Sequence, residues 1–334
     1  MGLARNLERV VAVDWSGDKG PGQRRKIWAG VWTRGAGKVA GGGVILENGR
    51  SREELAEWLI AMARETPRMV VGIDCCFSYP AWFVREQGCA TVFDFWRHVA
   101  AGHGERWLGV GLAEEERDAR FWGRPHKRPA EFCGAGYPTM MRRTDMENKV
   151  EQALEGGDPA RAALMRGIQP KSPFQIGGSG SVGTGSLRAM EWLLRLSEAG
   201  FRVWPFEDSA LGKAKARPLL VEMYTRLLTG PVAKSNAGAR AAYLKRRRKE
   251  DALYAGLSRA VVAKAEGSED GFDALVCCVE MVRWQAEFAG LRAVKDKGLL
   301  LESVTWRPGV QKQKRPDAGR AALRAVLDAS REGD

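Results

Sequence analysis

The stretch RVVAVD, residues 9–14, decides the fold, because it is a short apolar run rich in β-branched residues that stops at a carboxylate. Such runs favour buried strands, and the Ser16-Gly17 pair that follows is typical of a turn. The same pattern returns in MVVGID, residues 69–74. The sequence therefore predicts two buried strands that end at Asp14 and Asp74.

Working outward from the first strand, two more strand-like segments follow at residues 26–33 and 43–46. Their short links predict an antiparallel meander. Ser51, with Glu54 three residues later, is typical of a capping box at the start of a helix. A helix between strands makes a crossover, so the strand at residues 69–74 is expected to run parallel to the first.

The second half of the chain adds further elements. Residues 80–170 mix short helical pieces with loops rich in Gly, Pro and Arg, which indicates a helical insertion. Residues 201–206 and 218–224 are strand-like, and Ser268 begins a long amphipathic helix that continues to about residue 288. We predict an α/β fold with a mixed five-stranded sheet flanked by helices.

The length of 334 residues fits one large domain with an insertion, or two smaller domains. We expect a domain over residues 1–305, with the insertion at about 80–170, and a basic tail over residues 306–334. Lys and Arg total 53 against 41 Asp and Glu, for a net charge of +12. This excess favours an anionic partner such as DNA or RNA, although a solvated basic surface is the plain alternative.

The cysteine and hydropathy patterns exclude several classes. The six cysteines form no Cys-x-x-Cys pair, and the three histidines show no paired spacing, so a zinc site is not expected. The first apolar run is too short for a signal peptide, and none is long enough to span a membrane. These features predict reduced core thiols without disulfide partners, in a cytoplasmic protein.

Acidic residues end three of the apolar runs: Asp14, Asp74 and Glu222. A buried strand excludes charge unless the charge is paired or binds metal. Asp270 and Asp273, one turn apart on the predicted long helix, can add to them. Clustered carboxylates repel one another without a cation, and their hard oxygens select Mg²⁺ or Mn²⁺. We therefore predict a metal site, while noting that each acid alone also suits a turn or a helix cap.

Four phrases carry a family resemblance: VDWSG at residues 13–17, GID at 72–74, VEMY at 221–224 and DGFDAL at 270–275. Their order resembles the RNase-H-like superfamily of nucleases, and within it the predicted-nuclease branch of unknown function. The similarity covers most of residues 9–290.

The resemblance implies a metal-dependent nuclease. Its metal ligands and catalytic residues would be Asp14, Asp74, Glu222 and Asp273. The chain departs from the best-known members by its helical insertion, and by an aspartate at Asp74 where many resolvase-like members have glutamate.

Two further segments are candidate phosphate contacts. Gly178, Gly180 and Ser181 lie in a Gly/Ser loop before a helix that we expect Ser186 to cap, and Lys171 precedes the loop. Backbone amides at a helix start can hold a phosphate, but a plain loop is an equal alternative. The loop also matches a dinucleotide fingerprint, which the absence of a preceding apolar run disfavours.

The second segment is the basic run Lys245, Arg246, Arg247 and Arg248, which could contact a nucleic-acid backbone. Its alternative is a solvated helix face, and we expect a further helix at about residues 250–265.

Three functions are therefore weighed. The first is a nuclease that hydrolyses phosphodiester bonds of nucleic acid with bound Mg²⁺ or Mn²⁺. The second is a non-catalytic nucleic-acid-binding or adaptor protein. The third is a phosphotransferase of the actin-like or sugar-kinase type, because residues 14–17 resemble the first phosphate motif of those proteins; residues 74–77 lack the glycine that the second motif needs.

Overall fold

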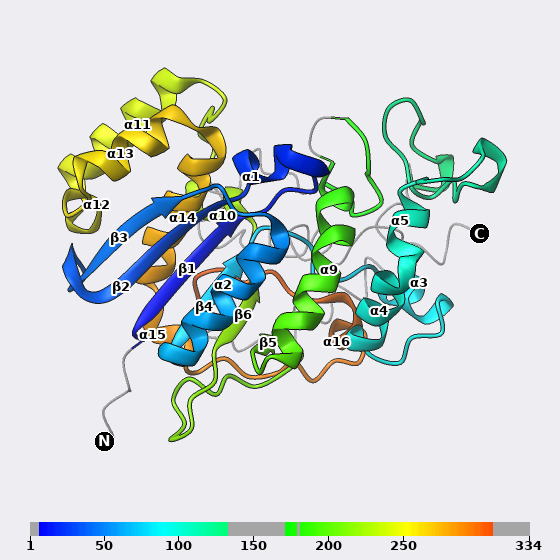
Figure 1. Cartoon of the computed structure of the whole chain (residues 1–334), viewed down its shortest axis with the longest axis horizontal. Coiled ribbons are helices and arrows are strands. Elements are labelled where there is room, and N and C mark those ends of the chain that lie inside the picture. The colour runs from blue at the N-terminus through cyan, green and yellow to red at the C-terminus, as the bar shows by residue number, and fades with distance from the viewer. Residues whose placement is uncertain (1–6, 133–170, 179–180, 310–334) are drawn as a thin grey trace, which may run out of the picture. The chain divides into compact units, whose positions relative to one another are not determined.

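The computed structural model describes residues 7–132, 171–178 and 181–309 (Figure 1). The described residues fall into two compact units. The first unit draws on Met1–Cys75, Trp192–Val294 and Trp306–Pro308, and the second on Cys76–Glu191 and Lys295–Thr305. The predicted tail at residues 306–334 lies almost entirely outside the described residues, so that boundary stays a prediction.

The first unit contains one mixed sheet with the strand order β3-β2-β1-β4-β6-β5. The strands are β1 (Arg9–Asp14), β2 (Trp28–Val39), β3 (Gly42–Glu47), β4 (Met69–Ile73), β5 (Arg202–Trp204) and β6 (Leu219–Glu222). β2 is antiparallel to both β1 and β3. β4 is parallel to β1, β6 to β4, and β5 to β6.

The expected α/β class, the meander and the parallel return of β4 are confirmed. The expected number of strands is wrong, because the sheet has six strands rather than five. The extra strand is β5, a three-residue edge strand that pairs Arg202 with Leu219 and Trp204 with Val221 of β6. A short strand can join an open edge with few hydrogen bonds, so both strand-like segments of the second half enter one sheet.

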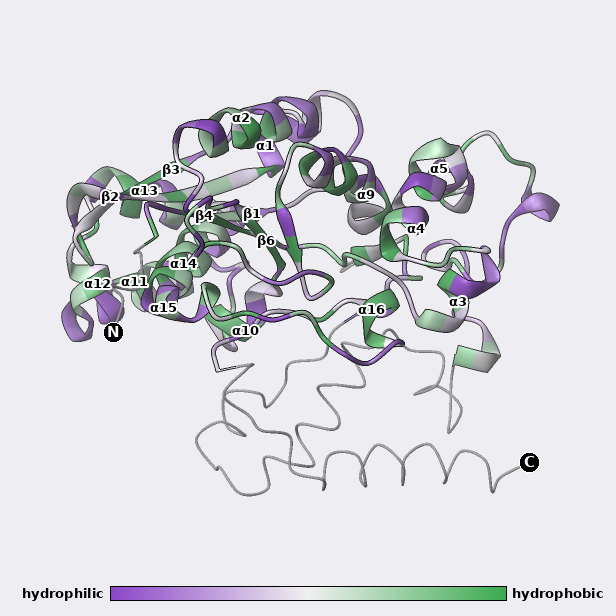
Figure 2. Cartoon of the chain, turned by 90° about the horizontal axis from the view of Figure 1, so that it is seen from below, coloured by the Kyte–Doolittle hydropathy of each residue, from purple (hydrophilic) through white to green (hydrophobic). Residues whose placement is uncertain are grey.

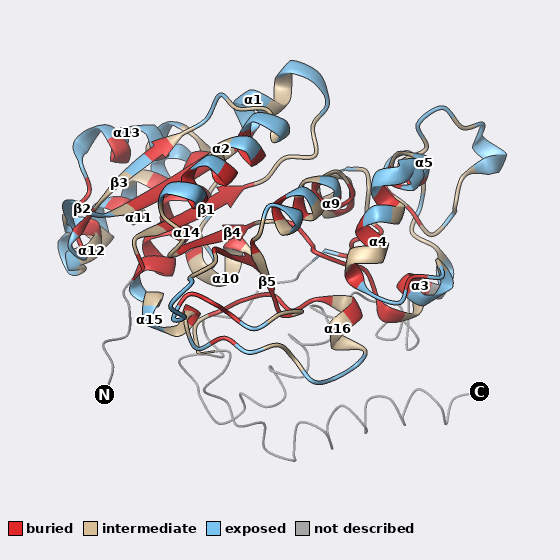
Figure 3. Cartoon of the chain, turned by 60° about the horizontal axis from the view of Figure 1, so that its bottom comes forward, coloured by how far each residue is buried: buried red, intermediate tan, exposed pale blue. Residues whose placement is uncertain are grey.

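Helices cover both faces of this sheet. α2 (Arg52–Glu65) lies on one face, and α14 (Glu269–Arg283) lies on the other (Figures 1 and 2). The capping box predicted at Ser51 is present, and the Ser268 hydroxyl accepts a hydrogen bond from Gly271 N at the start of α14. With helices on both sides, β1 and β4 are buried almost throughout, which explains their continuous apolar runs (Figure 3).

Two glycines let α14 approach the sheet closely. A Cβ atom on Gly30 of β2 would lie 2.6 Å from the carbonyl oxygen of Ala274, and one on Gly72 of β4 would lie 2.8 Å from Met281 Sδ. Ala12 of β1 pairs with both glycines in register. These three small residues therefore form one row across the sheet, directly under α14.

The remaining helices of the first unit are α1 (Gln23–Lys26), α10 (Thr225–Thr229), α11 (Ala237–Glu250), α12 (Ala252–Ala255), α13 (Arg259–Gly267) and α15 (Gln285–Phe288). The single helix expected at residues 250–265 is wrong. The basic run is itself helical, as part of α11, and Asp251 and Ser258 cap two shorter helices after it. The side-chain caps divide this segment into separate helices, whereas the apolar spacing alone suggested one continuous helix.

The second unit contains α3 (Ala81–Glu86), α4 (Val92–His98), α5 (Gly104–Trp107) and α16 (Leu299–Glu302), as well as the part of α9 (Val182–Glu198) up to Glu191. Its core is aromatic: Tyr79, Phe83, Phe95, Phe121 and Phe174 are fully buried and in mutual contact. α3, α4 and α5 lie within the segment expected to be a helical insertion, but residues 133–170 lie outside the described residues, so the insertion and its bounds stay a prediction.

The start of α9 differs from the expectation. The helix begins at Val182, so Ser186 lies inside it rather than capping it. The Ser186 hydroxyl donates to Val182 O and accepts from Cys76 N, both at 2.9 Å. Gly183 and Gly185 do not delay the helix, because packing outweighs their low helix propensity.

Within the described residues the cysteines are buried and form no disulfide: Cys75, Cys76, Cys89, Cys277 and Cys278. Cys133 lies outside this part of the chain. Among the helices of the described residues, none has both the length and the apolar character needed to cross a bilayer.

Candidate functional site

Asp14 and Asp74 come together at the carboxyl ends of two adjacent parallel strands. Asp14 is the last residue of β1, and Asp74 directly follows β4. The register pairs Val13 with Ile73, and Asp74 N donates to Val13 O at 3.0 Å. The two aspartates are therefore the next neighbours along the two strands. This is the sheet edge at which α/β proteins commonly bind ligands.

Both carboxylates lie on the face that α14 covers. Side chains two residues apart on a strand lie on the same face of the sheet. Asp14 therefore faces the same side as Ala12, and Asp74 the same side as Gly72; Ala12 and Gly72 lie under α14. α14 brings Asp273, which is completely buried, and Asp270, which is half-buried, to this edge. The structure therefore gathers four of the five acids predicted from the sequence.

Burial and the charges of neighbouring acids shift the pKa values of this cluster. Burial raises the pKa of Asp14 well above its ordinary value, and the charges of Asp273, Asp74 and Asp270 raise it further. Burial and Asp273 also raise the pKa of Asp74 from 3.8 to about 7, against the lowering effects of Lys234 and of hydrogen bonds from Thr225. Like charges at close range disfavour ionisation, so it is unfavourable for all acids of this cluster to be ionised at once.

The two acids of α14 show the same direction. Burial raises the pKa of Asp273, while the ammonium of Lys234 lowers it. Burial also raises the pKa of Asp270, and Lys234 again acts in the opposite direction. Asp273 Oδ1 is buried and has no hydrogen-bond partner. A buried carboxylate oxygen without a donor is costly, which marks it as a candidate ligand atom.

Lys234 is the residue of this site that the sequence did not single out. Its ammonium forms an ion pair with Asp273 Oδ2 and lies 3.5 Å from Glu269 Oε1. Burial lowers the pKa of Lys234, but the charges of Asp273, Asp14 and Asp74 outweigh this, so its pKa is raised. The lysine lies in the link between α10 and α11, where its sequence neighbours carry no pattern that points to a site.

Arg240 of α11 holds the backbone of Lys234 in place. Arg240 is buried, and its Nη1 donates to Lys234 O at 2.5 Å. Its Nε and Nη2 donate to Glu266 O at 3.0 and 2.7 Å. One guanidinium thus ties the loop of Lys234 to the end of α13, next to the start of α14. The lysine is positioned through its main chain rather than through its side chain.

Glu222 is not brought into the acid cluster. It pairs in register with Ile73, one residue before Asp74, and is buried. Because adjacent strand residues face opposite sides of a sheet, Glu222 lies on the α2 face, away from Asp14 and Asp74. An offset of one residue, which apolar runs cannot reveal, separates it from the site that the resemblance implied.

The predicted phosphate loop belongs to the second unit. Lys171 and Gly178 are exposed, Ser181 precedes α9, and Gly180 lies outside the described residues. Residues 171–178 form no strand, only an isolated bridge at Gln175. The dinucleotide interpretation therefore lacks the strand it needs, and phosphate contact by these residues stays a prediction.

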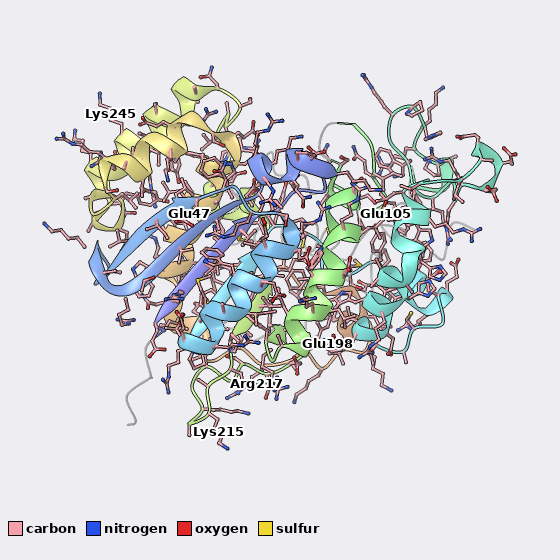
Figure 4. The ribbon with its side chains drawn as sticks, in the orientation of Figure 1. Glu47, Glu105, Glu198, Lys215, Arg217 and Lys245 are labelled. Carbon is pink, nitrogen blue, oxygen red and sulfur yellow. The ribbon has the colours of Figure 1, made fainter. Side chains whose placement is uncertain are left out.

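The predicted basic run divides into two kinds of side chain. Arg247 bonds to Glu280 at 2.7 Å and to Asp251 at 2.9 Å, so it is engaged within the protein. Arg248 is half-buried, whereas Lys245 and Arg246 are exposed. Figure 4 shows Lys245 pointing outward from α11. Only the exposed members are available to a partner in this structure.

The donor set can be tested against Mg²⁺ or Mn²⁺. Within the described part of the chain, no group of three or more His, Cys, Asp or Glu side chains is arranged to hold a metal ion. The chemistry nevertheless fits: carboxylate oxygens suit these cations, Asp273 Oδ1 has no donor, and the aspartates outnumber the one ammonium among them. The negative charge of the cluster suits a divalent cation, but its carboxylates are arranged around the ammonium of Lys234.

The site therefore consists of Asp14 and Asp74 from the strand ends, Asp270 and Asp273 from α14, and Lys234 from a loop anchored by Arg240. Its half-buried members, Asp74, Asp270 and Lys234, leave it open to solvent ions. Buried acids with raised pKa values are typical of functional sites. Comparison of the chain with protein-family models, curated proteins and solved structures found no match.

Proposed function

We propose that this protein is a metal-dependent nuclease that hydrolyses phosphodiester bonds of DNA or RNA. The observation that carries the proposal is the meeting of Asp14, Asp74 and Asp273 at one edge of the sheet, where a single lysine offsets only part of their negative charge. Asp14, Asp74 and Asp273 would hold the cation, with Asp270 on the more exposed side.

The order of elements supports an RNase-H-like core. An antiparallel β1-β2-β3 meander, the α2 crossover and the parallel strand β4 match the order on which the sequence resemblance rests. β6 continues the parallel part, and α14 returns with Asp273. β5 is an addition at the sheet edge.

Charge explains why the cation matters for substrate binding. A nucleic-acid phosphate is an anion, and the ionised aspartates would repel it. Once bound, Mg²⁺ or Mn²⁺ would neutralise this repulsion, polarise the phosphoryl group and activate water. Asp14 and Asp273 fix their carboxylates by burial, since both are closed in between β1 and α14. The buried carboxylates would supply the oxygen ligands, although in the metal-free protein they surround the Lys234 ammonium.

The test uses labelled single- and double-stranded DNA and RNA with Mn²⁺ or Mg²⁺. We expect the wild-type protein to cleave at least one of these substrates, and Asp14→Asn to lose both cleavage and Mn²⁺ binding. Glu198→Gln is the matched control, because Glu198 is exposed on α9 and undergoes the same carboxylate-to-amide change. Equal cleavage by wild type and Asp14→Asn, or no cleavage by either, would refute the proposal.

A second candidate is a nucleic-acid-binding protein without catalysis. The exposed Lys245, Arg246 and Lys249 on one face of α11 favour it, as they would favour a nuclease. A binder would show salt-dependent affinity for nucleic acid that Asp14→Asn leaves unchanged, and no cleavage with any divalent cation.

A further inference from the structure

Lys234 is the only basic residue that forms an ion pair with Asp273 among the described residues. It bonds to Oδ2, and Oδ1 of the same carboxylate stays without a donor. Its charge also acts on Asp14, Asp74 and Asp270. One ammonium therefore acts on the whole acid cluster without satisfying it, which differs from an ion pair whose only role is structural.

The attachment of Lys234 lets its side chain move without its loop. Arg240 fixes the Lys234 carbonyl, while the lysine side chain remains 24% exposed. A lysine side chain has several rotatable bonds and a compact ammonium, so it can change partners at low cost. The ammonium can therefore leave Asp273 for solvent while the main chain keeps its hydrogen bonds.

We propose that Lys234 is a built-in counter-ion that competes with the divalent cation for Asp273, so that metal binding must displace its ammonium from the acid cluster. This inference rests on the cation site of the proposed function, and it adds a regulation of that site. It also explains why the carboxylates have the net negative charge that a divalent cation requires, although they are arranged around a lysine. In the metal-free protein Lys234 offsets part of the negative charge of the acid cluster, and the same contact lowers the affinity of the cluster for a cation.

The experiment measures Mn²⁺ affinity by calorimetry on the full chain after treatment with EDTA. Lys234→Gln removes the competing charge, and we expect it to bind Mn²⁺ about tenfold more tightly, or more, than wild type. Lys215→Gln is the matched control, because it makes the same change on an exposed residue of the same unit (Figure 4). Its Mn²⁺ affinity should stay within about twofold of wild type, since solvent and salt screen an exposed charge.

Thermal unfolding gives a second measurement. Without metal, Lys234→Gln should melt below wild type, because the aspartates lose their counter-ion. Saturating Mn²⁺ should close this difference. Lys234→Arg is the alternative variant if Lys234→Gln does not fold. Its guanidinium can bond both oxygens of Asp273, so this variant should bind Mn²⁺ more weakly than wild type.

The outcomes separate this inference from the proposed function. Unchanged or weaker Mn²⁺ binding by Lys234→Gln, or stronger binding by Lys234→Arg, would overturn the competition even if the protein cleaves nucleic acid. Tighter Mn²⁺ binding by Lys234→Gln without cleavage by any variant would support the competition and reject the nuclease. Failure of every variant to bind Mn²⁺ would overturn both.

Discussion

α14 carries two buried acids with opposite surroundings. Asp273 lies in the cluster at the sheet edge, where acidic groups exceed the one lysine. Glu280, further along the same helix, accepts hydrogen bonds from Arg247 at 2.7 Å, Arg283 at 2.8 Å and the Tyr254 hydroxyl at 3.0 Å. The same element thus presents one carboxylate with too few donors and one with several.

The second network, which we name the Glu280 network, is balanced. It joins Glu280 and Asp251 to Arg247 and Arg283, two acids with two bases, and Tyr254 closes it. A balanced network is best explained by its role in holding α11, α12 and α14 together. An unbalanced one costs stability, so its persistence points to a ligand that completes it. The predictions below test this contrast.

The largest expected effect is loss of the Glu280 network. Glu280→Ala takes one of two carboxylate partners from the partly buried guanidinium groups of Arg247 and Arg283, which keep only Asp251, and removes the acceptor of Tyr254. We expect the free energy of unfolding to fall by about 2 to 4 kcal/mol, somewhat below the cost for a fully buried pair because the arginines are partly exposed. Urea denaturation measures this change.

An exposed ion pair provides the control. Glu57 pairs with Arg195, and both side chains are about half exposed. Glu57→Ala should change the free energy of unfolding by less than about 0.5 kcal/mol. A loss in Glu280→Ala no larger than this would mean that the Glu280 network does not hold the helices together.

The acid cluster should respond in the opposite direction. Asp14→Asn removes one of the mutually repelling charges, so the metal-free protein should gain roughly 1 to 3 kcal/mol of stability. Urea denaturation in EDTA measures the gain, and added Mn²⁺ should stabilise wild type but not the variant. A clear loss of stability in EDTA would show that Asp14 is satisfied within the protein, as Glu280 is.

The pH dependence follows from the raised pKa values. Because the folded-state pKa of Asp74 is raised from 3.8 to about 7, the folded protein binds more protons than the unfolded chain at Asp74 between about pH 4 and pH 7, and the raised pKa values of Asp14 and Asp273 act in the same direction. Stability of the metal-free protein should therefore fall as pH rises through this window, by about 1 kcal/mol per pH unit. Lys234 stays protonated throughout and does not contribute. Denaturation at pH 5, 6 and 7 tests the sign, and a rise in stability would contradict the cluster's repulsion.

The smallest effect concerns the exposed cations of α11. Lys245 and Lys249 are exposed on the helix that also supplies Arg247 to the Glu280 network. Changing both lysines to glutamine should alter stability by less than about 0.5 kcal/mol. It should lower the salt slope of nucleic-acid binding by about 2, as measured by titration at several salt concentrations. An unchanged slope would remove this face from the binding surface.

Apolar periodicity predicted the strands well, because buried β-branched runs leave little choice of structure. β1, β4 and the capping box at Ser51 lie within a residue or so of where the sequence indicated. Asp14 and Asp74 were predictable for a related reason, since a charge at the end of a buried run needs an explanation, whereas Asp273 was predicted from its place one turn after Asp270 on the long helix.

The remainder depended on tertiary structure. Whether Glu222 faces α14 or α2 depends on a register offset of one residue, which pairing between distant strands decides. Lys234 reaches Asp273 because Arg240 holds the loop of Lys234, and no sequence pattern links these three residues. The role of Arg247 likewise depends on Glu280, so the basic run could not be divided into its bound and exposed members beforehand.

The row of Ala12, Gly30 and Gly72 has a consequence for which acid fits the site. Helix and sheet pack closely along this row, because a Cβ atom on Gly30 or Gly72 would lie 2.6 or 2.8 Å from an atom of α14. In so narrow a gap a short acid reaches its neighbours and a longer one would have to bend or push the layers apart. The close packing at these glycines therefore favours aspartate over glutamate in the site. Longer acids would require a wider space between α14 and the sheet.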